Sequence, residues 1–306
     1  DDPAIWINPA DPARSLVLGT DKDSLGALYV YDLDGKIVAD KVVRGLRRPN
    51  NVDVEYGFSL NGQPTDIAVV TERLTNRLRI FRLPNLQPVD GGGLPVFEGE
   101  PQRAPMGIAL YKRPSDGAVF AIVGRKEGPT NGSYLWQYRL ESDGPEKVRA
   151  TLVRKFGRWS GKKEIESIVV DDQLGYVYYS DETVGVRKYH ADPDRGDDRE
   201  LALFATTGFT SDHEGLSIYQ TDARTGYILV SDQQASQFHL FRREGTPTNP
   251  HDHRLVRIVK LSLVESDGSE VTSQALGPRF PGGLFVAMSD DRTFHYYAWK
   301  DLVGEK

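Results

Sequence analysis

Charged residues recur along this chain directly after short apolar runs that have the composition of β-strands. Six runs each end in a small residue followed by a charged one: Leu18-Gly-Thr-Asp21, Val70-Thr-Glu72, Val123-Gly-Arg125, Tyr179-Ser-Asp181, Val230-Ser-Asp232 and Met288-Ser-Asp290. Many acids lie at these positions or at the start of a preceding run: Asp1, Asp2, Asp21, Glu72, Glu164, Glu166, Asp181, Glu182, Asp212, Glu214, Asp232, Asp290 and Asp291. If gathered, they would repel one another unless a cation were bound. Hard oxygen ligands in such number suit calcium.

Basic residues occupy the same register in the first three repeats. Lys22, Arg73 and Lys126 each follow a strand end, with Arg125 before Lys126 and Glu127 after it. Later repeats carry acidic pairs there, so one side of a shared site would be cationic and the other anionic. Phosphate monoester hydrolysis needs this combination of a metal that activates water and basic groups that neutralise phosphoryl oxygens. The alternatives are ordinary turn chemistry, solvated lysines and a surface ion pair between Arg73 and the preceding glutamate.

A repeat of about fifty residues must position these groups. An apolar-x-x-aromatic phrase occurs six times, and its closing aromatics are 50 to 57 residues apart: Tyr31, Phe81, Tyr138, Tyr189, Phe241 and Tyr297. A period of this size indicates a repeat architecture. Together with the other short β-type runs of each unit, it predicts an all-β fold, a six-bladed β-propeller with four-stranded antiparallel blades.

A third run in each unit begins with polar residues and then turns apolar. Five copies are clear, namely Asp2-Pro-Ala-Ile-Trp6, Asn51-Val-Asp-Val54, Met106-Gly-Ile-Ala-Leu110, Glu166-Ser-Ile-Val-Val170 and Glu214-Gly-Leu-Ser-Ile218, and the sixth is blurred after Asp267. Consecutive strands of a blade are antiparallel, so the start of this run and the end of the next meet at one mouth of the propeller. The scattered charges therefore form one predicted site.

Length and composition restrict the alternatives. The 306 residues divide into six units of 51, so we expect a single propeller domain over 1–306 that can work as a monomer. With 44 acids against 38 Lys and Arg, the net charge of −6 argues against nucleic acid as a partner. No apolar run is long enough to span a membrane. The chain opens inside a repeat motif without a signal peptide, and we expect a mature secreted or periplasmic protein.

Several catalytic classes are excluded. The chain has no cysteine, which removes thiolate nucleophiles, Cys-zinc sites and disulfides. The motifs of serine hydrolases, P-loop enzymes, zinc proteases and dinucleotide-binding enzymes are all missing. His251 and His253 have a ligand-like spacing, but their Thr, Asn and Pro neighbours favour a solvated loop. Strand alternation would turn His213 away from the acids on either side of it.

The combination of motifs resembles the β-propeller phytases over essentially the whole chain. The matching segments are Asp1-Asp-Pro-Ala-Ile-Trp6, Gly19-Thr-Asp-Lys22, Tyr31-Asp-Leu-Asp-Gly35, Asn50-Asn-Val-Asp53, Lys126-Glu-Gly128, Asp212-His-Glu-Gly-Leu216, Ser231-Asp-Gln233 and Leu276-Gly-Pro…Pro281-x-Gly-Leu-Phe285. The resemblance implies several calcium ions at one mouth and hydrolysis of phosphate from phytate, myo-inositol hexakisphosphate, without a covalent intermediate. Calcium would bind the scissile phosphate and lower the pKa of the attacking water.

The resemblance also implies residue roles. Lys22, Arg73 and Lys126 would hold phosphate, and we add Arg125 as a substrate contact and Glu127 and Glu182 as catalytic neighbours. Candidate calcium ligands are Asp2, Asn51, Asp53, Glu166, Asp181, Glu182, Asp212, Glu214, Asp232, Asp267 and Asp290. Of these, Asn51 and Asp53, with Asn50, would serve a calcium that stabilises the fold or orders the mouth.

The chain departs from the family pattern at several positions. Met106 stands where the family has a tyrosine, and a thioether is a poor calcium ligand. Glu72-Arg73 replaces Asn-Arg, Ile165-Glu-Ser167 replaces Thr-Glu-Gly, and the acidic loop is shortened to Glu265-Ser-Asp-Gly-Ser-Glu270. Two other functions stay open: a propeller lactonase, although a neutral lactone needs no basic mouth, and a non-catalytic propeller that binds a ligand or partner.

Overall fold

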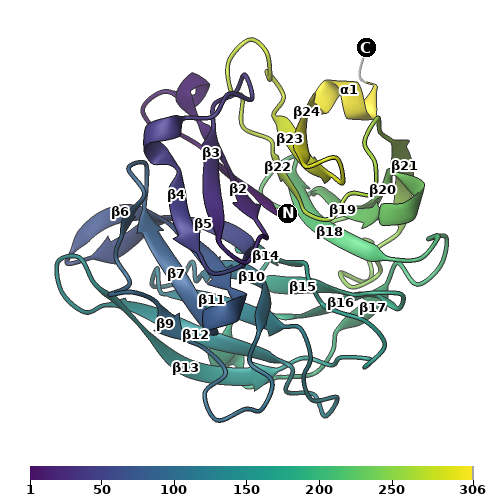
Figure 1. Ribbon diagram of the computed structural model, residues 1–306. Coiled ribbons are helices and arrows are strands. Elements are labelled where there is room, and N and C mark those ends of the chain that lie inside the picture. The colour runs from purple at the N-terminus through teal and green to yellow at the C-terminus, as the bar shows by residue number, and fades with distance from the viewer. Residues whose placement is uncertain (305–306) are drawn as a thin grey trace.

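Each recurring aromatic phrase forms the third strand of an antiparallel sheet, and six such sheets surround a common axis (Figure 1). The computed structural model describes residues 1–304. The second run of each unit forms the second strand, and the polar-to-apolar run forms or immediately precedes the innermost strand. The six-bladed β-propeller predicted from the repeat is therefore confirmed.

The first three blades follow the chain in order. Blade 1 contains β1 (Pro3–Trp6), β2 (Leu16–Asp21), β3 (Gly26–Tyr31) and β4 (Val43–Leu46). Blade 2 contains β5 (Pro49–Leu60), β6 (Gln63–Glu72), β7 (Arg77–Arg82) and β8 (Gln87–Pro88), and β9 (Leu94–Pro95) also pairs with β7. Blade 3 contains β10 (Pro105–Lys112), β11 (Val119–Arg125), β12 (Leu135–Ser142) and β13 (Val148–Phe156).

The last three blades repeat this sequential order. Blade 4 contains β14 (Ile168–Asp171), β15 (Tyr176–Asp181), β16 (Gly185–His190) and β17 (Ala202–Phe204). Blade 5 contains β18 (His213–Gln220), β19 (Gly226–Asp232), β20 (Gln237–Arg242) and β21 (Leu255–Lys260). Blade 6 contains β22 (Ser269–Thr272), β23 (Leu284–Ser289) and β24 (Thr293–Ala298). Its first strand begins two residues after Asp267, which locates the sixth copy that the sequence left blurred.

Helical structure is sparse. The chain forms one short α-helix, α1 (Trp299–Val303), within the part that the structure describes. Short 3-10 helices lie in connections at Pro12–Arg14, Ala39–Lys41, Arg73–Thr75, Pro193–Arg195 and Gln233–Ala235. Within residues 1–304, helices of the length and apolarity needed to span a bilayer are absent.

The hydrophobic core is divided among the interfaces between blades. Six clusters of buried side chains each join two neighbouring blades, and the cluster around Val17, Leu284 and Val286 joins blade 6 to blade 1. A strand between two such interfaces is buried on both faces, which explains why β11 reads as a nearly continuous apolar run. This packing fixes the inner strands, and with them the side chains at the mouth.

The innermost strands of blades 2, 3 and 5 are irregular where they begin. Their pairing with the second strand shifts between Pro49 and Val52, between Pro105 and Ile108, and between His213 and Leu216. Such bulges change the direction of side chains and are common beside active sites. The three bulges lie at the same end of the ring, where the charged residues gather.

Candidate active site

The second strand of five blades ends at the first residue of a polar pair, and the second residue of that pair lies just beyond the strand. Successive side chains at a strand end point in opposite directions. The pairs are Asp21-Lys22, Glu72-Arg73, Arg125-Lys126, Asp181-Glu182 and Asp232-Gln233. In blades 2 to 5 the first member is buried, whereas Lys126, Glu182 and Gln233 line or contact the mouth. Two adjacent residues therefore have different roles.

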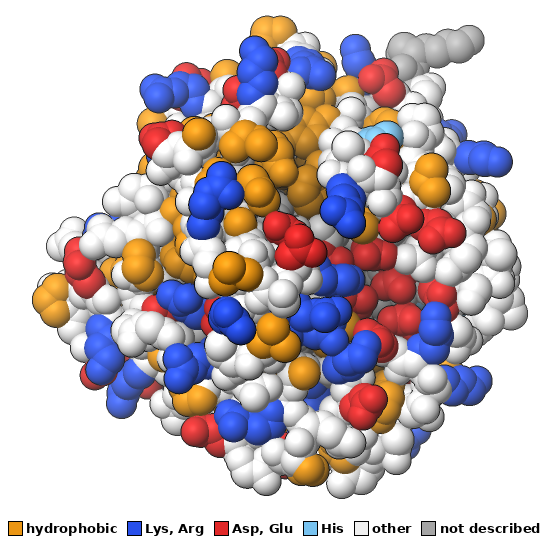
Figure 2. All heavy atoms as spheres, in the orientation of Figure 1, with side chains coloured by type: hydrophobic (Ala, Val, Ile, Leu, Met, Phe, Trp, Pro, Cys, Tyr) orange, Lys and Arg blue, Asp and Glu red, His pale blue; other side chains and the backbone are white. Residues whose placement is uncertain are grey.

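Carboxylates from blades 4 and 5 form the acidic half of the mouth. One carboxylate oxygen each from Glu164, Glu166 and Glu182 lie within 4.8 Å of one another, and the same holds for Glu182, Asp212 and Glu214. In Figure 2 acidic side chains gather in a hollow of the ring, with Lys and Arg side chains beside them. The pocket next to these groups has a volume of about 580 Å³. The oxygen-only donor set and the short separations fit a hard divalent cation such as calcium.

The crowding of these carboxylates changes their protonation. Burial, and then the nearby Glu166, raise the pKa of Glu182 to about 8. Burial also raises the pKa of Glu214 well above its ordinary value, with Glu166 and Glu182 as further causes. Burial would raise the pKa of Glu166 too, but Lys22, Asn50 and Arg73 together hold it below its usual value. The cluster is therefore short of positive charge on the side of Glu182 and Glu214.

Lys22 and Arg73 reach the opposite side of the acidic cluster. The Lys22 ammonium lies 2.6 Å from Asp1, 3.3 Å from Glu166 and 3.6 Å from Asp267. Asn50 joins the two halves, because its amide donates to Glu166 at 2.7 Å and its carbonyl accepts from Arg73 at 3.0 Å. Lys126 pairs with Glu164, and Glu127 lines the same pocket as Lys126.

Arg73 does not form a surface ion pair with Glu72, which was the alternative to a phosphate-binding role. Glu72 accepts from the backbone N–H of Arg47 at 2.7 Å and from the Thr75 hydroxyl at 2.5 Å. These bonds turn its carboxylate away from the mouth and fix the turn before β5. Arg73 consequently donates to Asn50 and lies near Glu166 and Glu164 of the acidic cluster.

Arg48 is a basic neighbour of this site that the sequence interpretation missed. Its backbone carbonyl accepts from the N–H of Arg73 at 3.0 Å, and its charge contributes, after burial, to a lowered pKa of Arg73. Arg48 has no carboxylate partner among residues 1–304, and its buried Nε has no hydrogen-bond partner there. Its position directly before Pro49-Asn50 could have indicated a place beside the site. The repeat pattern did not include Arg48, because the residue lies outside the recurring strand-end position.

Some predicted site residues instead have structural partners. Arg125, the predicted substrate contact, is only 1% exposed, lies against the Phe97 ring beside Glu100, and does not line the mouth. Asp181 accepts from the Ser160 backbone and hydroxyl and from Arg187. Asp232 accepts from Thr210 and Gln237. In these pairs the neighbouring Lys126, Glu182 and Gln233 face the mouth.

The remaining predicted ligands are divided between the mouth and its surroundings. Asp2, Asn51 and Asp267 line a small cavity with Glu166 and Glu214. Asp290 is exposed and lines a separate pocket beside Lys22. Met106 is fully buried and contributes its backbone carbonyl to Thr71, so its thioether is not presented to solvent. His213 turns outward to the Ala205 carbonyl, as strand alternation predicted.

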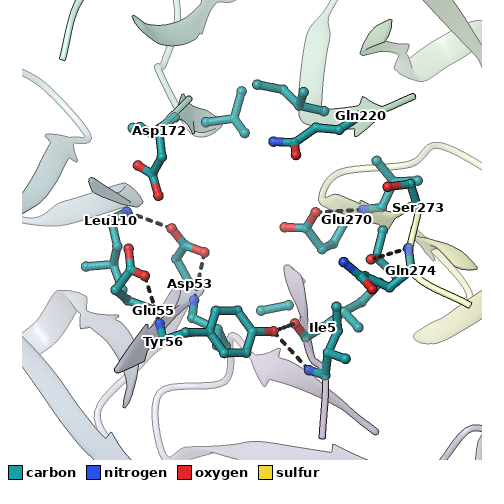
Figure 3. A pocket seen from close by; sticks show the side chains of 18 residues that line it. Ile5, Asp53, Glu55, Tyr56, Leu110, Asp172, Gln220, Glu270, Ser273 and Gln274 are labelled. Carbon is teal, nitrogen blue, oxygen red and sulfur yellow. Dashed lines mark hydrogen bonds between the residues drawn. The ribbon is translucent and has the colours of Figure 1, made fainter. Parts of the chain in front are cut away.

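Asp53 belongs to a second acidic group farther along the inner strands. Figure 3 shows Asp53, Glu55, Asp172 and Glu270 directed toward one space, a pocket of about 290 Å³ inside the ring. Each of these carboxylates accepts at least one backbone N–H. Burial raises the pKa of Asp53 to about 6 and that of Glu270 to about 8. The structure therefore separates Asp53 from the acids that line the mouth.

The loop with His251 and His253 also differs from expectation. His253 is buried rather than solvated, with Nδ1 2.7 Å from the Arg242 carbonyl and Nε2 3.1 Å from the Lys188 ammonium. Because Nδ1 donates to a carbonyl, Nε2 is the acceptor for Lys188. The pair holds the end of this loop against blade 4, so the prediction of a solvated position is wrong for His253, whereas residues 247–250 are exposed.

Comparisons with known proteins agree with the fold and identify a family. The phytase family model matches residues 1–296. The 3-phytase of Bacillus subtilis (strain 168) is 30% identical over 320 residues, which cover 99% of this chain and 80% of that protein. The WD40 β-propeller domain of Doa1 has a TM-score of 0.54 at 11% identity, covering 97% of this chain and 78% of its own, and supports the fold alone. The chain belongs to the phytase family.

Proposed function

We propose that this protein is a calcium-dependent phosphomonoesterase that hydrolyses phosphate from phytate at the mouth of the propeller. The observation that carries the proposal is the two-sided mouth: carboxylate oxygens within 4.8 Å of one another face Lys22, Arg73 and Lys126. Family membership supports a phosphatase-type hydrolase. A lactonase would not need three basic residues beside its acidic cluster.

The acidic half would hold more than one divalent cation. Glu182 belongs to both carboxylate groups, so it is placed to bridge two ions. The raised pKa of Glu182 and of Glu214 means that part of the cluster keeps its protons without a cation. Calcium binding would release those protons, because a nearby cation favours the ionised carboxylate. When bound, calcium supplies a water of lowered pKa and neutralises phosphoryl oxygens.

The basic half would bind and orient the phosphate. Lys22 and Lys126 are held by carboxylates in the structure, and calcium would compete for those oxygens and free the ammonium groups for phosphate. Arg73 is aimed by Asn50, and a fixed guanidinium can stabilise charge that develops on the phosphoryl group. We assign Arg48 to binding the phosphate, because guanidinium groups suit phosphate and it has no acidic partner in residues 1–304.

Each element of the site comes from one ring, so we also propose that the monomer is sufficient for activity. A secreted or periplasmic location stays a prediction.

The test is phosphate release from phytate with added calcium or with chelator, run on the parent protein and on Glu214→Gln. We expect calcium-dependent release from the parent and a loss of at least about a hundredfold in Glu214→Gln, since removing one charge-stabilising group commonly costs this much. Glu98→Gln is a matched control, because Glu98 is exposed and outside the mouth.

Two results would contradict the proposal. The parent could release no phosphate from phytate or simple monoesters while calcium still raises its melting temperature, which would make the ions structural. Alternatively, Glu214→Gln could retain the parent's rate at every calcium concentration, which would place the catalytic cluster elsewhere.

A further inference from the structure

The ammonium of Lys163 lies within the acidic cluster, on the side that is short of positive charge. It is 2.7 Å from Asp212 Oδ2 and 3.5 Å from Glu182 Oε2. These two carboxylates and Glu214 are the group whose oxygens lie within 4.8 Å of one another. The ammonium therefore contacts two of the three carboxylates that would bind a divalent cation.

The charges around Lys163 are unequal in number and in exposure. The side chains of Asp212 and Glu182 are 6% and 4% exposed, whereas that of Lys163 is 46% exposed. One ammonium faces the three carboxylates of Glu182, Asp212 and Glu214, so the positive charge contributed by Lys163 is smaller than the negative charge that these groups can carry.

The main chain around Lys163 is held firmly while its side chain faces solvent. The Trp159 indole donates to the Lys163 carbonyl at 2.6 Å, and its ring packs against Tyr134 at 5.2 Å. Ser160 donates to Asp181 from both its backbone N–H and its hydroxyl. The long, partly exposed side chain can consequently leave the cluster without unfolding the loop that carries it.

From these contacts we propose that Lys163 is a tethered counter-ion that competes with calcium for the cluster of Glu182, Asp212 and Glu214. Without calcium its ammonium reduces the repulsion among the three carboxylates. Calcium binding requires the ammonium to leave, because both cations need the same oxygens. Lys163 therefore sets how much calcium the site requires. This inference rests on the proposed function only in taking this cluster as a cation site.

Lys162 provides a matched control in the same loop. It lines the same pocket, but it makes no ion pair within residues 1–304, and its backbone N–H donates to the Ser160 hydroxyl. Lys162→Met removes one positive charge from the mouth without removing the contact to Asp212. A change specific to Lys163→Met therefore reports the local contact and not the net charge.

The experiment measures calcium binding to chelator-treated protein by isothermal titration calorimetry, in the absence of phytate. An exposed ion pair contributes up to about 1 kcal/mol, so its loss should tighten the affected calcium site by up to about fivefold in Lys163→Met. We expect Lys162→Met and Lys163→Arg to bind within about twofold of the parent. High salt should reduce the difference, because it screens the ammonium.

Thermal unfolding in chelator gives an independent measure. Lys163→Met should melt at a lower temperature than the parent without calcium and should gain more on calcium addition, since both effects follow from lost neutralisation. Lys163→Gln serves as a second variant if Lys163→Met does not fold. Unchanged or weaker calcium affinity in the Lys163 variants, or a parent that binds no calcium, would overturn the inference. A parent that binds calcium but releases no phosphate would refute the proposed function alone.

Discussion

Replacing Arg243 by methionine should cause a large loss of stability, because it leaves a buried charge without its partner. Arg243 and Asp171 are both fully buried. Arg243 donates two parallel hydrogen bonds to Asp171, from Nε to Oδ2 at 2.6 Å and from Nη2 to Oδ1 at 2.7 Å. The guanidinium also donates to the carbonyls of Asp222 and Thr225 at 3.0 and 3.2 Å. Asp171 ends β14 and Arg243 follows β20, so the pair joins blades 4 and 5.

The expected magnitude follows from this geometry. Removing one partner of a buried, hydrogen-bonded ion pair costs about 3 to 5 kcal/mol. With a urea m-value of roughly 3 kcal/mol/M for a chain of this size, the unfolding midpoint should fall by about 1 to 1.7 M. A carboxylate that is left buried without a partner destabilises the fold most when it is ionised, and ionisation increases as pH rises. The deficit should therefore be larger at pH 8 than at pH 5.

Urea unfolding, followed by circular dichroism and tryptophan fluorescence together, measures the change. Coincident transitions are required for a single free energy of unfolding. Arg242→Met is the control, because Arg242 is 55% exposed on its side chain and pairs only at the surface with Glu244. The double variant with Asp171→Asn should recover at least about 1 kcal/mol relative to Arg243→Met. A loss below about 1 kcal/mol, or a double variant no better than the single, would refute this reasoning.

Two further predictions concern pH and substrate binding. Burial, then Lys188 and His251, lower the pKa of His253 to about 4, while the hydrogen bond to the Arg242 carbonyl and the charge of Asp252 act in the other direction. The unfolded chain therefore binds this proton first, and the stability that neutral His253 provides is complete above about pH 6.5 and lost as pH falls toward 4. Melting curves between pH 7.5 and 4.5 should show a shallower decline for His253→Gln, and parallel curves would contradict the assignment. Arg48→Gln should raise the KM for phytate by about threefold to tenfold while kcat stays near that of the parent. The reason is that a guanidinium that binds ground and transition state alike affects KM alone. Steady-state kinetics at saturating calcium measure both constants, and an unchanged KM would contradict the prediction.

The sequence was sufficient for the architecture because each repeat contains the same strands in the same order. The aromatic phrase and the run before it are long enough to pack between two blades, so packing and local pattern agree. β14 shows the limit of the pattern, since the strand begins at Ile168, two residues after the polar start at Glu166. Because Glu166 lies in the segment that precedes the strand, and not within the strand, its side chain is at the mouth.

The candidate site was predicted less completely, and the reason is a difference of one residue. At the end of β11, the side chain of Arg125 turns into the protein and that of Lys126 turns to the mouth. Both residues are basic, so the pattern predicted both as contacts for the substrate. Pattern alone gives the pair but not the direction of each side chain, which depends on where the strand stops. Arg48 and Lys163 lie in connections outside the repeat, so no period could locate them.

The joint between blade 6 and blade 1 has a consequence for how the ring opens. Every sheet consists of strands from one continuous stretch of chain, so among the described residues no strand links the two ends of the ring. Besides the apolar cluster around Val17, Leu284 and Val286, the joint contains the contact of Tyr31 with Phe294, the N–H of Gly268 bonded to the Asp1 carbonyl, and Lys22 near Asp267. Any ligand that binds on both sides of this joint binds the closed ring only, and by linkage it opposes opening. Hydrogen exchange at β1 and β22 would therefore report occupancy of the mouth, although neither strand performs chemistry.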